Sequence, residues 1–190
     1  MGDKRLRQPF LFVGNHPCLD CINTQMIVRG EQMDLLNGFH DLEAWLVLAN
    51  IVNDRQGEES IMRWDRTEQE RLFDEAVAFR RVLRNMAERI VARKPIPPSA
   101  VAAINRILSQ SPGYPQLVHT QGHWERRFHS EVGQSARLLT PLAEAASDLL
   151  CSGDLSLVKK CGNAACILYF YDTTKNHTRN WCSMQLCGIA

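Results

Sequence analysis

The chain has 190 residues, 45% of them hydrophobic and 23% charged, and its formal net charge is +1. This length suits one ordinary domain with a small appendage, and the apolar content excludes a disordered chain. The near-neutral charge does not by itself call for a nucleic-acid partner, and no apolar run approaches the ~20 residues of a membrane span. We therefore expect a cytoplasmic protein with no membrane partner.

The N-terminal third predicts two extended segments followed by a helix. Short apolar runs at 10–13 and 19–22 flank Gly14 and Pro17, which is typical of strands around a turn. Between residues 38 and 53 the apolar side chains recur at the spacing of one helix face. These side chains are Leu42, Trp45, Leu46, Ala49 and Val52. Residues 57–64 are expected to form a connection.

Three longer helices and a hairpin are predicted from residue 67 onward. Thr67 and Glu70 fit a capping box, and the long apolar stripe behind them ends at Lys94-Pro95. A second helix is expected between 97 and 111 and a third between 135 and 150. A hairpin between these two helices would pair 117–120 with 124–128. The expected fold class is mainly α (α+β), a helical body with a small β-hairpin.

Four of the seven cysteines gather near the C-terminal end in two equally spaced pairs. The pairs are Cys161-x4-Cys166 and Cys182-x4-Cys187. This pattern is typical of a structural zinc site, whereas two disulfides or four small buried side chains are the alternatives. Four thiolates would fill the tetrahedron around the ion and leave no position for water. We therefore expect one structural Zn²⁺ and no catalytic metal.

The segment between the cysteine pairs predicts a treble-clef-like zinc finger. Residues 167–171 favour a strand and 172–176 favour a turn. Asn180 is a candidate N-cap that would place Cys182 in the first turn of a short helix. Alternatively, the helix begins near Ser183 so that Cys187 can reach the ion. Trp181 is expected to pack over the knuckle.

Polar residues in the apolar segment 19–24 form a second candidate site. Asp20 is costly to bury without a partner, and Arg80 on the long helix is its predicted partner. Asp20, Asn23, Thr24 and Arg80 would form either a structural strut or the lining of a small-molecule pocket. The nearby Cys18 and Cys21 are expected to be buried thiols rather than a redox pair.

The C-terminal segment resembles the CGNR zinc finger, and residues 19–24, LDCINT, are similar to the opening L-D-F-x-N-T signature of the ABATE domain. The finger residues that carry the resemblance are Lys160, the four cysteines, Phe170, Tyr171, Asp172, the run RNWCSM at 179–184, and Gly188. The resemblance implies a helical ABATE-like sensor domain at 1–153 and a CGNR-like zinc finger at 154–190. It also implies a stress-induced transcription regulator.

The resemblance implies DNA as a partner of the finger and a small-molecule effector for the body. Lys159, Lys175 and Arg179 are the candidates for contacting phosphate, mainly without regard to sequence. The chain departs from the Cys-Gly-Asn-Arg pattern and reads CGIA from Cys187, so we expect a shortened finger.

Two functions therefore remain open. The first is a DNA-binding transcription regulator. The second is a ligand- or protein-binding module in which the zinc is purely structural and DNA is not bound. An enzyme is not expected, because the histidines are scattered and neither G-x-S-x-G nor H-E-x-x-H occurs.

Overall fold

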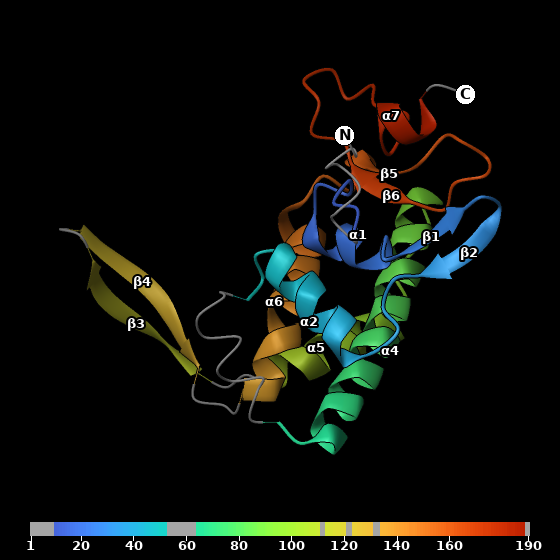
Figure 1. Cartoon of the computed structure of the whole chain (residues 1–190). Helices are drawn as coiled ribbons and strands as arrows, with labels where there is room; N and C mark the ends of the chain where they lie inside the picture. The colour runs from blue at the N-terminus through green and yellow to red at the C-terminus, as the bar shows by residue number, and fades with distance from the viewer. Residues whose placement is uncertain (1–9, 53–63, 111–112, 121–122, 131–133, 189–190) are drawn as a thin grey trace, which may run out of the picture.

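The computed structural model describes residues 10–52, 64–110, 113–120, 123–130 and 134–188 (Figure 1). Its helices are α1 (Pro17–Ile22), α2 (Phe39–Leu48), α4 (Arg66–Val91), α5 (Pro98–Ser109), α6 (Gln134–Ser152), the 3-10 turn η2 (Leu155–Leu157) and α7 (Met184–Cys187). Its antiparallel strand pairs are β1 (Gln25–Val28) with β2 (Glu31–Asp34), β3 (Gly113–Thr120) with β4 (His123–Ser130), and β5 (Val158–Lys160) with β6 (Tyr169–Tyr171). The predicted mainly helical fold with small β elements is confirmed. In the described part of the chain, none of the helices has the length and apolarity to cross a membrane.

Helix α4 is the scaffold on which α1, α2, α5, α6 and β5 pack. Its buried face includes Leu72, Phe79, Leu83 and Met86, each 2% exposed or less. The predicted cap at Thr67 is wrong, because the side chain of Asp65 accepts a hydrogen bond from the Glu68 N–H at 2.9 Å. Thr67 already lies within the helix, so the N-cap is Asp65, two residues earlier than expected.

The segment expected to be extended at 19–22 is instead helix α1. His16 is its N-cap and accepts a hydrogen bond from the Cys18 N–H at 3.3 Å, while Pro17 occupies the first helical position. Both Leu19 and Ile22 are buried. An apolar run this short is equally compatible with a buried strand and a buried helical turn, so periodicity alone did not distinguish them.

The structure contains one hairpin that the sequence did not predict and one that it did. In the β1–β2 hairpin, Arg29 and Gly30 both have positive φ, at 53° and 86°. This backbone suits a tight turn, but the pair lacks the usual Asn-Gly or Asp-Gly signal. The predicted hairpin is confirmed as β3–β4, which is longer than expected and stands away from the helices in Figure 1. Its turn, 121–122, lies outside the described residues, as does most of the expected connection at 57–64.

The main core joins the helical body to the C-terminal finger. Trp45, Phe79 and Met86 lie in the same cluster as Val158 of β5 and Tyr169 of β6. In Figure 1 the C-terminal end of α4 runs up beneath the β5–β6 pair. The strands of the finger therefore take part in the core of the body, while Leu168 and Phe170 form a second, smaller cluster with the cysteines.

Candidate metal centre

The four predicted cysteine ligands meet at one point at the top of the molecule. The Sγ atoms of Cys161, Cys166, Cys182 and Cys187 all lie within 4.8 Å of one another. The distance from Cys166 Sγ to Cys182 Sγ is 3.8 Å, and that from Cys182 Sγ to Cys187 Sγ is 3.7 Å. A tetrahedron with Zn–S bonds of about 2.3 Å has S···S edges of about 3.8 Å. The four thiols are free rather than disulfide-bonded, so the donor set fits one zinc ion.

Short local hydrogen bonds place each ligand pair. In the first knuckle, Asn163 Oδ1 accepts from the Ala165 N–H at 2.9 Å, and the Asn163 carbonyl accepts from the Cys166 N–H at 2.9 Å. At the second pair, Ser183 is the N-cap of α7 and accepts from the Gln185 N–H at 3.2 Å. The predicted Asn180 cap is therefore wrong, and the helix begins after Ser183, so that Cys187 in its last position reaches the other sulfurs.

The environment of the thiols differs from one ligand to the next. The hydrogen bond with Cys182 lowers the pKa of Cys166 to about 5. Burial raises the pKa of Cys187 to about 11. Zinc binds the thiolate form of cysteine, so binding of the ion must release the proton of Cys187. The Cys182 N–H lies 3.4 Å from Cys161 Sγ and donates a hydrogen bond to it.

Asp172 organises the loop that connects the two ligand pairs. Its fully buried carboxylate accepts from Lys159 Nζ at 2.6 Å, from Thr174 Oγ1 at 2.6 Å and from the Arg179 N–H at 3.0 Å. Burial opposes ionisation, but the Lys159 ammonium and the Thr174 donors outweigh it and hold the pKa of Asp172 well below its usual range. The sequence contained Asp172 in the family-like motif but did not indicate that it would be the hub of the loop.

The predicted phosphate-binding residues have different surroundings. Lys159 also donates to the His177 carbonyl at 2.7 Å, and Arg179 lies 4.1 Å over the Phe170 ring. Arg179 donates further to the carbonyls of Trp181, Cys182 and Val13. Lys175 is exposed. The side chains of Lys159 and Arg179 thus stabilise the fold of the finger through internal contacts, whereas Lys175 faces solvent.

Asn23 connects the helical body to the finger. Its Nδ2 donates to the Tyr169 carbonyl at 2.7 Å, and its Oδ1 accepts from the Tyr169 N–H at 2.9 Å. Asn23 is 0% exposed, so both bonds are shielded from water. The side chain thereby satisfies the free edge of β6 as a neighbouring strand would.

The expected Asp20–Arg80 pair is wrong, because each group has another partner. Asp20 Oδ1 accepts from the Gly14 N–H at 2.7 Å. A Cβ at position 14 would lie 2.8 Å from the Asp20 nitrogen, so the close approach requires glycine. Arg80 instead pairs with Asp34 and donates to Thr24 Oγ1 at 2.7 Å. The sequence did not indicate Asp34 as the partner of Arg80, because the β1–β2 hairpin that carries it was not predicted.

These contacts favour the strut over the pocket at the second candidate site. Asp20, Asn23, Thr24 and Arg80 are all buried, and each binds another part of the chain. Arg84, which sequence reasoning missed, adds a link by donating to the carbonyls of Ile22 and Ile167. Cys18 and Cys21 are buried as predicted, and burial raises the pKa of Cys21 to about 12.

The fold and the four-thiol centre define a zinc-finger protein with a helical body. The ABATE family model, described as "Putative stress-induced transcription regulator", matches residues 15–153. The CGNR zinc finger model matches residues 158–189. The chain belongs to the ABATE family, and the predicted order of an ABATE domain followed by a CGNR zinc finger is confirmed. No curated protein matches the chain.

Replacing one zinc ligand should release the metal. We expect Cys166→Ser to weaken zinc binding by more than about 100-fold, beyond the effect typical of groups that only orient a ligand. Because β5 and β6 share the main core, the thermal midpoint of the whole chain should also fall. Zinc per chain, measured by elemental analysis after dialysis, tests this. The control is Cys151→Ser, an exposed thiol outside the centre, and full zinc retention by Cys166→Ser would contradict the assignment.

Removing the Asn23 side chain should loosen the finger from the body. Asn23→Ala leaves a buried N–H and a buried carbonyl of Tyr169 unpaired, at a cost of roughly 2–4 kcal/mol in the free energy of unfolding. Asn105→Ala is the matched control, because Asn105 is an exposed asparagine on α5, away from the finger. Urea unfolding of both zinc-loaded variants gives the comparison, and equal destabilisation would contradict a special role for Asn23.

Asp20 should make the stability depend on pH in an unusual direction. Burial raises the pKa of Asp20 to about 6 from the ordinary aspartate value of 3.8. Between about pH 4 and 6 the folded state then holds a proton that the unfolded state has lost, so this group's contribution to stability decreases as pH rises. The unfolding free energy of the parent, relative to that of Asp20→Asn, should therefore decrease as the pH rises from 5 to about 7. A difference that stays constant across this range would refute the raised pKa.

Proposed function

We propose that the protein is a cytoplasmic transcription regulator in which the zinc finger contacts DNA and the helical body responds to a small-molecule effector. The observation that carries the proposal is the family match over residues 15–153, joined to a zinc finger that shares its core. The proposal assigns no catalytic step, because four thiolates fill the coordination sphere of zinc. Reduced, metal-binding thiols are consistent with a cytoplasmic location.

The packing supports a coupling between body and finger. Tyr169 and Val158 of the finger lie in the core of the body, and Asn23 and Arg84 bind the backbone of the finger directly. A change in the position of α1 or α4 must therefore move β6 or break these bonds. Such a rigid connection is what a regulator needs if an effector on the body is to alter the DNA affinity of the finger.

Lys175 is the strongest of the three proposed phosphate contacts. It is exposed on the loop that Asp172 organises. The Lys159 side chain instead binds the His177 carbonyl of that loop, and the Arg179 side chain binds the carbonyls of Trp181 and Cys182, which follow it, and of Val13. We assign Lys175 a direct contact with phosphate and assign Lys159 and Arg179 the positioning of the loop. Phosphate contacts of this kind supply affinity that falls as salt displaces the released counterions.

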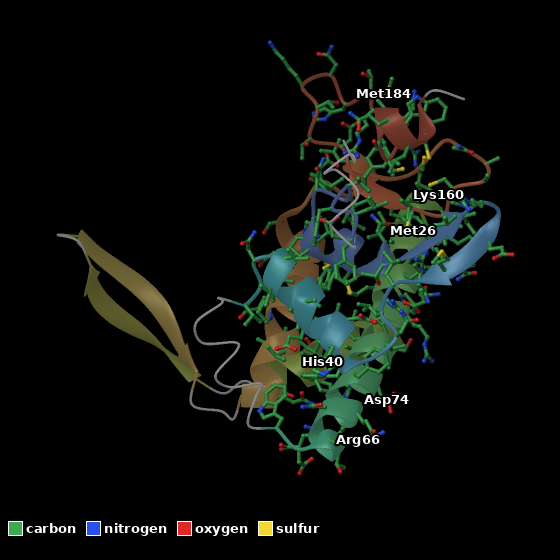
Figure 2. All side chains as sticks on the ribbon, viewed as in Figure 1. Met26, His40, Arg66, Asp74, Lys160 and Met184 are labelled. Carbon is green, nitrogen blue, oxygen red and sulfur yellow. The ribbon has the colours of Figure 1, made fainter. Side chains whose placement is uncertain are left out.

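The salt dependence of DNA binding tests the proposal. The zinc-loaded protein should bind a fluorescent mixed-sequence duplex more tightly at roughly 50 mM than at 200 mM salt. Lys175→Gln should reduce the slope of log affinity against log salt by about 1. The control is Arg66→Gln, which removes an exposed cation at the opposite end of α4 (Figure 2). Absence of duplex binding at the lower salt, with zinc bound, would refute the DNA-binding function.

A second function is a ligand- or protein-binding module in which the zinc is purely structural. The observation that favours it is the use of Lys159 and Arg179 for internal contacts, which leaves less charge for phosphate. It predicts a folded, zinc-loaded protein without duplex affinity at any salt concentration.

A further inference from the structure

A groove of about 820 Å³ lies where the C-terminal end of α4 meets the finger. One wall comes from the last turn of α4 and the residues after it, 90–96, and the other from β5, Gly162 and residues 179–181. Its volume falls in the range of small-molecule sites. The groove is separate from the buried set around Asp20 and Arg80.

The charged lining of the groove is entirely basic. The cations are Arg93, Lys94, Lys159, Lys160 and Arg179, and no aspartate or glutamate lines it. Lys159 is neutralised by Asp172, and Arg179 is bound to backbone carbonyls. In the part of the chain that the structure describes, Arg93, Lys94 and Lys160 form no ion pair. Lys160 is the last residue of β5 in the finger, where Figure 2 labels it.

The zinc centre offsets only part of this charge. A zinc ion with four thiolates carries a formal charge of about −2, and Cys161 is the next residue after Lys160. The C-terminal end of α4 also carries a partial negative charge, which basic residues complement. Arg93 and Lys94 nevertheless face the groove from the wall opposite the thiolates, so a positive surplus remains there.

The remaining lining is apolar and partly exposed. Val91 is 38% exposed, Pro95 is exposed, and Ile96 and Trp181 are half-buried. The Trp181 ring lies directly against Gly162, where a Cβ would be 3.1 Å from Trp181 Cζ3. The glycine therefore lets the indole pack closely on the first zinc knuckle and form one wall of the groove.

The turn that carries Arg93 and Lys94 is held in one conformation. Arg93 has a φ of 53°, and its N–H donates to the Ile90 carbonyl at 2.9 Å. The Lys94 N–H donates to the Arg89 carbonyl at 2.9 Å, and Arg89 Nε donates to the Pro95 carbonyl at 2.9 Å. These bonds end α4 in a left-handed cap and reduce the ordering cost of binding a ligand beside it.

We propose that this groove binds a small amphipathic organic anion, such as an aromatic carboxylate. The carboxylate pairs with Lys94, Arg93 and Lys160, and the apolar part lies against Val91, Pro95 and Trp181. A concave site with an apolar floor suits such a molecule better than the phosphate backbone of DNA. A ligand here contacts both α4 and the finger. Its role as an effector rests on the proposed function, whereas its binding does not.

Calorimetry with naphthoate on the zinc-loaded full chain tests the proposal. Naphthoate should bind, and the neutral naphthamide should bind at least about tenfold more weakly, because it lacks charge-assisted hydrogen bonds. Val91→Glu places a carboxylate in the groove, and Lys94→Gln removes a cation; each should weaken naphthoate binding about tenfold. The matched control is Val101→Glu on α5, where the parent side chain is 42% exposed and outside the groove. It should leave the affinity unchanged.

Several outcomes would overturn the assignment. They are no naphthoate binding by the parent protein, equal affinity for naphthamide, or an affinity that Val91→Glu does not change. If Val91→Glu weakens duplex DNA binding but leaves naphthoate binding unchanged, the groove belongs to the nucleic-acid surface and the anion proposal is wrong. If naphthoate binds as expected but no duplex binds, the DNA-binding function fails and the anion site stands.

Discussion

The buried side chain of Asn23 pairs with the free edge of β6, and this contact attaches the finger to the helical body. Asn23 satisfies both backbone groups of Tyr169 that face away from β5, and Gly14 and Asn15 do the same for Tyr171 through bonds of 2.7 and 3.2 Å. Without these contacts, β6 would present an unpaired edge next to the main core. The N-terminal segment therefore acts as the third strand of the finger without being a strand.

Because β6 of the finger packs on the body, polar side chains of each part bind backbone carbonyls of the other. Arg179 of the finger binds the Val13 carbonyl, while Arg84 of the body binds the Ile167 carbonyl. β5 pairs with one edge of β6, and the N-terminal segment closes the other. The zinc ligands Cys161 and Cys166 lie just after β5 and just before β6. Metal binding and body packing thus stabilise the same short strand, so each depends on the other.

The basic residues of the finger divide into two groups with different roles. Lys159 and Arg179 compensate buried oxygens, since a carboxylate or carbonyl left unpaired beside the core would be costly. Lys160 and Lys175 remain exposed. A count of cations along the sequence therefore overstates the charge available to a partner. The surplus that remains lies partly on the finger and partly at the end of α4, which places the basic groove between them.

The sequence by itself determined the zinc ligands, the long helix α4, the β3–β4 hairpin and the family. These features depend on local chemistry: thiol spacing, apolar periodicity and short motifs. Only the tertiary structure decided that 19–22 form α1, that Arg80 pairs with Asp34 rather than Asp20, and that Lys159 and Arg179 serve the interior. It also decided where the groove lies. The partners of buried polar groups come from distant segments of the chain. The packing of helices and hairpins decides which of several carboxylates pairs with a given guanidinium. A local sequence pattern does not contain that information.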